Sequence, residues 1–166
     1  MKPVIIIVGK SGSGKNFVFE SIGLRYVPGY TERPLRSSDN KHLYHKILDK
    51  KLLDTDEITG ETYFNGYYYW TLMKDINNTE YDFMILSKEG LENFLKKYEN
   101  RKYKKRKYDR DFQIIYLHCN FFKRFKNMYK RGDKLLNIIK RLIHDFKAFK
   151  GIEELIIKNK GTLIEI

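Results

Sequence analysis

The feature of the sequence that most restricts its fold is an apolar run, Val4 to Val8, that leads directly into the letters GKSGSGKN. A short continuous apolar run is typical of a strand buried on both faces of a parallel sheet. Gly9, Gly12 and Gly14 let the backbone curl until several N–H groups point at one anion, and a following helix adds positive potential. Strand, glycine loop and helix together predict a phosphate-binding loop, in which Lys15 reaches the outer phosphates.

The last letter of this loop departs from the usual pattern. Asn16 stands where such loops carry Ser or Thr, whose hydroxyl holds Mg²⁺ against the phosphates. The side-chain amide oxygen of Asn16 is still a ligand that Mg²⁺ accepts, directly or through a water. We therefore expect Asn16 to be the metal ligand. The nucleotide is expected to contact Gly9, Ser11, Gly12, Ser13, Gly14, Lys15 and Asn16.

The rest of the chain alternates apolar runs with helical patterns, which predicts an α/β fold: a parallel sheet with helices on both faces. Further strands are expected at Phe83 to Leu86, Phe112 to His118 and Thr162 to Ile166. Helices are expected at Lys15 to about Leu24, Lys88 to about Tyr98, Asn120 to about Lys130, and Leu135 to Phe149. In the last helix, the residues expected to face the core are Ile138, Ile139, Leu142, Ile143 and Phe146. Turns and loop are expected from Tyr26 to Asn40, and irregular structure from Leu43 to Trp70.

Composition narrows the class of protein. A chain of 166 residues is long enough for one domain, and its single cysteine, Cys119, cannot form an internal disulfide. The N-terminal apolar run is too short to span a membrane, so we expect a cytoplasmic protein without a membrane partner. The net charge of +12 suits phosphate-bearing ligands, although a lysine-rich composition from AT-rich codons explains it equally well. The basic run Arg101 to Arg110 is interpreted as a solvated tip, with single-stranded nucleic acid as the alternative partner.

Two further basic pairs suit nucleotide phosphates. Arg33 and Arg36, in TERPLR, can close as planar forks on a second phosphate. Arg131 and Arg141 lie on either side of a glycine break at Gly132, which suits a mobile lid over a transferring phosphoryl group.

Taken in order, these segments resemble those of the guanylate kinases over nearly the whole chain. GKSGSGKN resembles that family's phosphate loop, TERPLR its T-T-R-x-P-R segment, and NGYYYWT its G-N-Y-Y-G-T segment. The resemblance implies that the acceptor phosphate is bound by Arg33, Arg36, Tyr44 and Tyr69, and the guanine by Glu61 and Thr71. It also implies that Arg131 and Arg141 are lid arginines and that Asn159 lies near the adenine.

What the resemblance implies is one domain over residues 1–166, with its core at 1–30, 81–125 and 136–166. The monophosphate-binding region would be about 31–80 and the lid about 126–136. The implied activity is transfer of the γ-phosphoryl group of ATP, with Mg²⁺, to GMP or dGMP. The alternatives are a kinase for another nucleoside monophosphate, and a catalytically weak scaffold or nucleic-acid-binding module.

Three departures from the family pattern bear on these implications. Ser87 replaces an acidic residue of the metal region, and Trp70 replaces the glycine of Y-G-T. Glu61 aligns with the family's guanine-binding glutamate only after a one-residue deletion, so Glu57 is a second candidate.

Overall fold

The structure is a computed structural model that describes residues 1–15, 17, 21, 23–34, 44–46, 50–64, 66–103 and 110–166. For residues 44–46, 52 and 101–103 it describes the backbone alone. The described residues form two compact units. Unit 1 comprises Met1–Val4, Arg25–Met84 and Glu89–Phe112, and unit 2 comprises Ile5–Leu24, Ile85–Lys88 and Gln113–Ile166.

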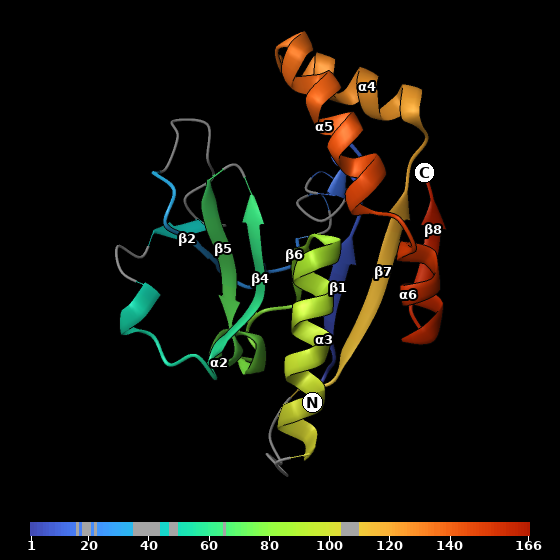
Figure 1. The fold of residues 1–166 in the computed structure, drawn as a ribbon. Coiled ribbons are helices and arrows are strands. Elements are labelled where there is room, and N and C mark those ends of the chain that lie inside the picture. Colours follow the sequence, from blue (N-terminus) through green and yellow to red (C-terminus); the bar gives the residue numbers. More distant parts are fainter. Residues whose placement is uncertain are drawn as a thin grey trace. The chain divides into compact units, whose positions relative to one another are not determined.

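A four-stranded parallel sheet, most of whose residues belong to unit 2, confirms the predicted α/β fold. Its strand order is β6 (Phe83–Leu86), β1 (Val4–Val8), β7 (Phe112–His118) and β8 (Thr162–Glu165). The unit also contains helices α4 (Phe121–Lys130), α5 (Leu135–Ala148) and α6 (Ile152–Lys158), which follow β7 along the chain (Figure 1). Val4, Ile6, Ile7 and Val8 of β1 are fully buried, as expected for a strand covered on both faces.

Helices α4 and α5 form an antiparallel pair around Gly132, whose φ of 86° only glycine adopts readily. Asn120 caps α4, because its side-chain oxygen accepts the N–H of Lys123 at 2.9 Å. Met128 of α4 packs against Ile138 and Leu142 of α5. The prediction for the other face of α5 is wrong: Ile139, Ile143 and Phe146 are exposed, Phe146 at 82%. The apolar residues of α5 cover two faces of the helix, and only one of these faces packs against α4.

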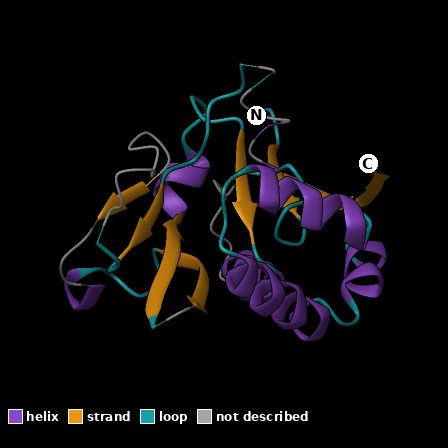
Figure 2. Ribbon diagram, turned by 90° about the horizontal axis from the view of Figure 1, so that it is seen from above, coloured by secondary structure: helices purple, strands orange, loops and turns teal. Residues whose placement is uncertain are grey.

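Unit 1 contains a second sheet. Three of its strands lie mainly in the segment predicted to be irregular, Leu43 to Trp70, and one in the segment predicted as turns and loop, Tyr26 to Asn40, so both predictions are wrong there. The strand order of this sheet is β3 (Tyr44–Lys46), β2 (Gly29–Thr31), β5 (Tyr67–Leu72) and β4 (Ile58–Phe64). Strands β4 and β5 form an antiparallel hairpin, and β2 and β3 pair in parallel (Figure 2). The unit also includes the 3₁₀ turn Lys50–Leu52, α2 (Met73–Asn77) and nearly all of α3 (Lys88–Tyr103).

A β-bulge in β4 decides which side chains share a face of this sheet. Thr59 pairs with Thr71, and Thr62 pairs with Tyr69, so Gly60 and Glu61 together lie opposite one residue of β5. Because side chains alternate along a strand, Tyr69 and Thr71 share one face, and Tyr68 and Trp70 share the other. We call these the threonine face and the tryptophan face.

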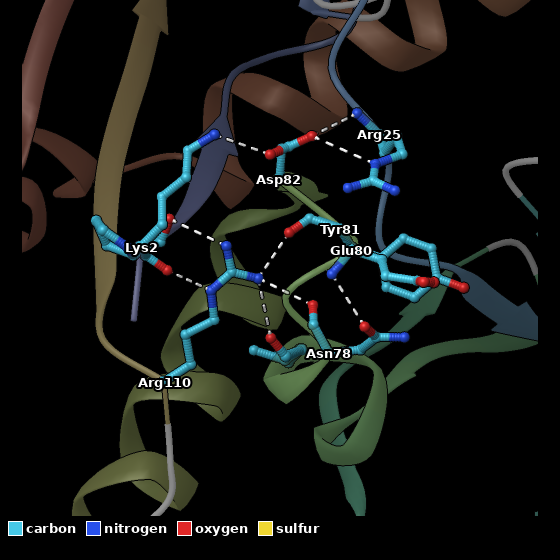
Figure 3. A network of polar contacts seen from close by, with 9 residues as sticks. Lys2, Arg25, Asn78, Glu80, Tyr81, Asp82 and Arg110 are labelled. Carbon is cyan, nitrogen blue, oxygen red and sulfur yellow. Dashed lines mark hydrogen bonds and ion pairs between the residues drawn. The ribbon is translucent and has the colours of Figure 1, made fainter.

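Arg110 is buried, so the interpretation of Arg101 to Arg110 as a solvated tip is wrong for this last residue. Residues 104–109 lie outside the described residues. The guanidinium group of Arg110 donates hydrogen bonds to five backbone carbonyl oxygens, at distances from 2.5 to 3.4 Å (Figure 3). These oxygens belong to Lys2, Pro3, Ile76, Asn78 and Tyr81. Burial lowers the pKa of the Arg110 guanidinium, and the carboxylate of Asp82 partly opposes this effect. Arg110 therefore holds together three separate segments of unit 1.

We expect Arg110→Met to reduce the free energy of unfolding by at least about 3 kcal/mol, because several buried carbonyl oxygens lose their donor. Arg25→Met is the matched control: the Arg25 side chain is 62% exposed and its Nε lies 4.0 Å from Asp82. The control should cost less than about 1 kcal/mol, as exposed ion pairs do. Urea unfolding measures both, and equal costs for the two variants would contradict a stabilising role for Arg110.

Candidate functional site

The glycine loop after β1 is held tightly against α4. Gly12 has φ +77°, and a Cβ atom at that position would lie 2.6 Å from the carbonyl oxygen of Arg124. The conformation and the close approach both require glycine. The N–H of Ser13 closes the turn on the carbonyl oxygen of Lys10, at 3.2 Å. The loop therefore has the tight, glycine-dependent curvature of a phosphate-binding loop.

Lys15 is partly buried and folds back over the loop. Its ammonium group donates to the carbonyl oxygens of Gly9, at 2.5 Å, and Lys10, at 2.9 Å, and lies 3.5 Å from the Ser13 hydroxyl. Burial lowers the pKa of Lys15 from 10.5 to about 8. The carboxylate of Asp145 opposes this shift, while the guanidinium groups of Arg124 and Arg131 add to it. Lys15 is therefore still mostly charged at neutral pH and loses its charge as the pH rises through about 8.

Asp145 and Arg124 are site residues that the sequence did not reveal. Both side chains are only 6% exposed and form an ion pair between α5 and α4. Asp145 Oδ2 accepts the N–H of Ser11 at 2.7 Å, and Arg124 Nε donates to the carbonyl oxygen of Ser11 at 2.8 Å. Asn127 adds a hydrogen bond to the carbonyl oxygen of Gly12 at 2.8 Å. The sequence signal for Asp145 is that it is the single acidic residue of α5, an otherwise basic and apolar helix.

The two predicted lid arginines both belong to unit 2. Arg131 ends α4, and its guanidinium group forms a two-pronged ion pair with Asp133. The charge of the Arg131 guanidinium group helps to lower the pKa of Lys15 in the phosphate loop. Arg141 lies four residues before Asp145, hence on the same side of α5. Asn159 caps α6, since its side chain donates to the carbonyl oxygen of Leu155 at 2.9 Å.

Unit 1 brings two of the predicted acceptor residues together. Arg33 is buried, and its Nε donates to the hydroxyl oxygen of Tyr69 at 3.1 Å. The backbone N–H of Arg33 donates to the hydroxyl of Thr31, which in turn donates to the carbonyl oxygen of Tyr68 at 2.9 Å. A guanidinium group and a phenol fixed side by side are donors suited to a phosphate anion.

Thr71 and Glu61, the predicted guanine ligands, lie on opposite faces of the sheet. Thr71 is buried on the threonine face beside Thr59, whose hydroxyl oxygen finds no hydrogen-bond partner among the described residues. Glu61 forms an ion pair with Lys50, whose ammonium group lies 4.2 Å from the ring centre of Tyr68, on the tryptophan face. The second candidate, Glu57, accepts the N–H of Lys74 at the start of α2.

Three predicted contacts lie outside what the structure describes: Asn16, Arg36 and the side chain of Tyr44. In the described part of the chain, no group of three or more His, Cys, Asp or Glu side chains could hold a metal ion. The carboxylate bonded to the loop, Asp145, is occupied by Ser11 and Arg124. Over the same residues, no helix is long and apolar enough to cross a membrane.

No protein-family model matches the chain, and no curated protein matches its sequence. Among solved structures, the chain is similar to the guanylate kinase of Anaplasma phagocytophilum, with a TM-score of 0.51 and 14% sequence identity. The match covers 99% of this chain and 77% of the other. At this identity the likeness shows that the two proteins share a fold: an α/β fold like that of guanylate kinase.

Proposed function

We propose that this protein is a nucleoside monophosphate kinase that transfers the γ-phosphoryl group of ATP, as its Mg²⁺ complex, to GMP or dGMP. The observation that carries the proposal is the phosphate loop of unit 2. There Lys15 lies under a glycine-dependent turn, and the charge of Arg131 is close enough to shift its pKa. The guanylate kinase-like fold and the Arg33–Tyr69 pair add separate support.

The proposed reaction is an in-line displacement. An oxygen of the acceptor phosphate forms a bond to the γ-phosphorus of ATP as the bond to the β,γ-bridging oxygen breaks, and ADP leaves with the electron pair. The acceptor oxygen is already anionic, so no strong general base is required. Catalysis then depends on positioning and on positive charge around the transferring group, which we assign to Lys15, Arg131 and Arg141.

In this proposal one group of residues binds ATP and another binds the acceptor nucleotide. The loop from Gly9 to Asn16 binds the ATP phosphates, and Asn159 lies near the adenine. The acceptor phosphate is bound by Arg33, Arg36, Tyr44 and Tyr69. Arg131 is paired with both carboxylate oxygens of Asp133. A guanidinium group can make the same two-pronged contact with a phosphate, so Arg131 would move from Asp133 to the transferring phosphoryl group as the lid closes.

For the base, the sheet favours Thr71 over Glu61. Thr71 shares the threonine face with Tyr69. The hydroxyl of Thr59, which has no hydrogen-bond partner in the described part of the chain, lies beside Thr71. Glu61 is on the tryptophan face and is already paired with Lys50. Hydroxyl groups accept and donate, and so they discriminate among bases less sharply than a carboxylate does. A kinase for another nucleoside monophosphate is therefore the second candidate.

The direct test supplies ATP, Mg²⁺ and each ribo- and deoxynucleoside monophosphate in turn to the purified protein and follows the formation of ADP. GMP or dGMP should be the best acceptor, and Arg33→Met should lower turnover by on the order of 10²-fold or more. Turnover with another base alone would identify the second candidate. Absence of turnover with every acceptor would refute kinase activity.

The pKa of Lys15 predicts the pH dependence of ATP binding. The ammonium form binds phosphate and has a free pKa of about 8, so affinity should be constant below pH 8 and weaken as pH rises above it. Titrations of ATP from pH 7.5 to 9.5 measure this. Lys15→Arg is the control, because arginine stays charged throughout and should give a flat profile. An equal decline in both proteins would show that another group titrates.

A further inference from the structure

The structure holds one residue of the phosphate loop, Ser11, by both of its backbone polar groups. The N–H of Ser11 donates to Asp145 Oδ2 at 2.7 Å, and its carbonyl oxygen accepts from Arg124 Nε at 2.8 Å. Asp145 Oδ1 also lies 3.4 Å from the Ser11 hydroxyl. The next carbonyl oxygen, that of Gly12, accepts from Asn127. Two side chains of α4 and one of α5 thus fix successive backbone groups of the loop.

We infer that Arg124 and Asp145 are positioning residues. Together they set the conformation of the phosphate loop through the backbone N–H and carbonyl oxygen of Ser11. This inference rests on the proposed function, because it takes the loop to be the ATP site. Neither side chain is free to touch a ligand: both are 94% buried, and their polar groups are directed at each other and at Ser11. They act through the loop and not on the phosphates.

The cost of burying these charges argues for a specific purpose. Two buried ions are stable only when their mutual attraction and further hydrogen bonds offset the loss of hydration, and an apolar pair of similar size is often as stable. An apolar pair could join α4 to α5, as Met128, Ile138 and Leu142 do one turn away. It could not bond to both the backbone N–H and the backbone carbonyl oxygen of Ser11. The ionic pair supplies one acceptor and one donor for these two groups.

The pair also acts on the charge of Lys15. The groups that influence the Lys15 ammonium are Asp145, Arg124 and Arg131, of which only Asp145 is negative. The imidazole of His144 also lies beside Asp145: its Nδ1 is 3.9 Å from Asp145 Oδ1, and its side chain is 55% exposed. Removing the negative charge would leave the two guanidinium groups unopposed and lower the pKa of Lys15 below its value of about 8.

The decisive variant replaces both partners, Arg124→Met with Asp145→Leu. An apolar pair of similar volume should keep the fold, so a loss of function is not a loss of folding. We expect the double variant to unfold at about the parent's urea concentration, while its affinity for ATP falls by about tenfold or more. Hydrogen exchange without nucleotide should show faster exchange of the Ser11 amide. Parental ATP affinity and parental Ser11 protection in a folded double variant would overturn the inference.

A conservative variant and a matched control separate positioning from general stability. Asp145→Asn keeps the shape and should move the weakening of ATP binding to a lower pH than in the parent, a change that a purely structural role would not produce. Asp82→Asn is the control: Asp82 accepts a backbone N–H from Arg25 and pairs with Lys2, both at 2.9 Å, in unit 1. It should leave ATP affinity, its pH profile and the exchange of Ser11 unchanged.

Failure of this inference differs from failure of the proposed function. If the parent protein binds no ATP, the proposed function fails, and the exchange rate of the Ser11 amide alone decides whether the pair sets the loop. If the parent binds ATP and the double variant binds it equally well, the proposed function stands and the positioning role falls.

Discussion

The structure depends on one physical constraint: a guanidinium group taken out of water must find partners for its N–H donors. Each unit contains an arginine that meets this constraint by gathering backbone groups from distant parts of the chain. In unit 1, Arg110 gathers carbonyl oxygens from the N-terminus and from the segment after α2. In unit 2, Arg124 gathers a carboxylate from α5 and a carbonyl oxygen from the loop after β1.

The two arginines solve the same problem in different ways, and the difference matches their surroundings. Arg110 is surrounded mainly by carbonyl dipoles, and burial lowers the pKa of its guanidinium group, an effect that the carboxylate of Asp82 partly opposes. Arg124 is paired with Asp145, so little net charge is added next to the phosphate loop. We assign a phosphate site to this loop. Because Arg124 is paired with Asp145, the positive potential at that site would come mainly from Lys15, Arg131 and Arg141.

Sequence patterns predicted the parallel sheet and the loop well, because β1 and β6 are continuous apolar runs and each strand has glycine or a helical pattern beside it. The hairpin of β4 and β5 was missed for a physical reason: the bulge at Gly60 and Glu61 breaks the period of two that identifies a strand. The roles of Arg110 and Asp145 could not be predicted either. One lies in a basic run and the other in a helix, and only tertiary contacts distinguish each from a solvated neighbour.

For the predicted binding residues too, the sequence alone does not show which side chains the fold brings together. Arg33 and Tyr69 are far apart in sequence and bonded in the structure, as the family resemblance implied they could be. Glu61 and Thr71 are implied by the same resemblance, yet the pleat of the sheet directs them to opposite faces. Counting residues along a strand cannot establish a shared face where a bulge adds one residue.

The state of Lys15 has a thermodynamic consequence for any phosphate ligand. A lysine whose pKa lies near 8 is only partly protonated in mildly alkaline solution, and an arriving anion would draw the missing proton from the solvent. Binding would then be coupled to proton uptake from the buffer. The heat released on binding would include the ionisation heat of that buffer, so calorimetry in two buffers would count the protons that this one side chain takes up.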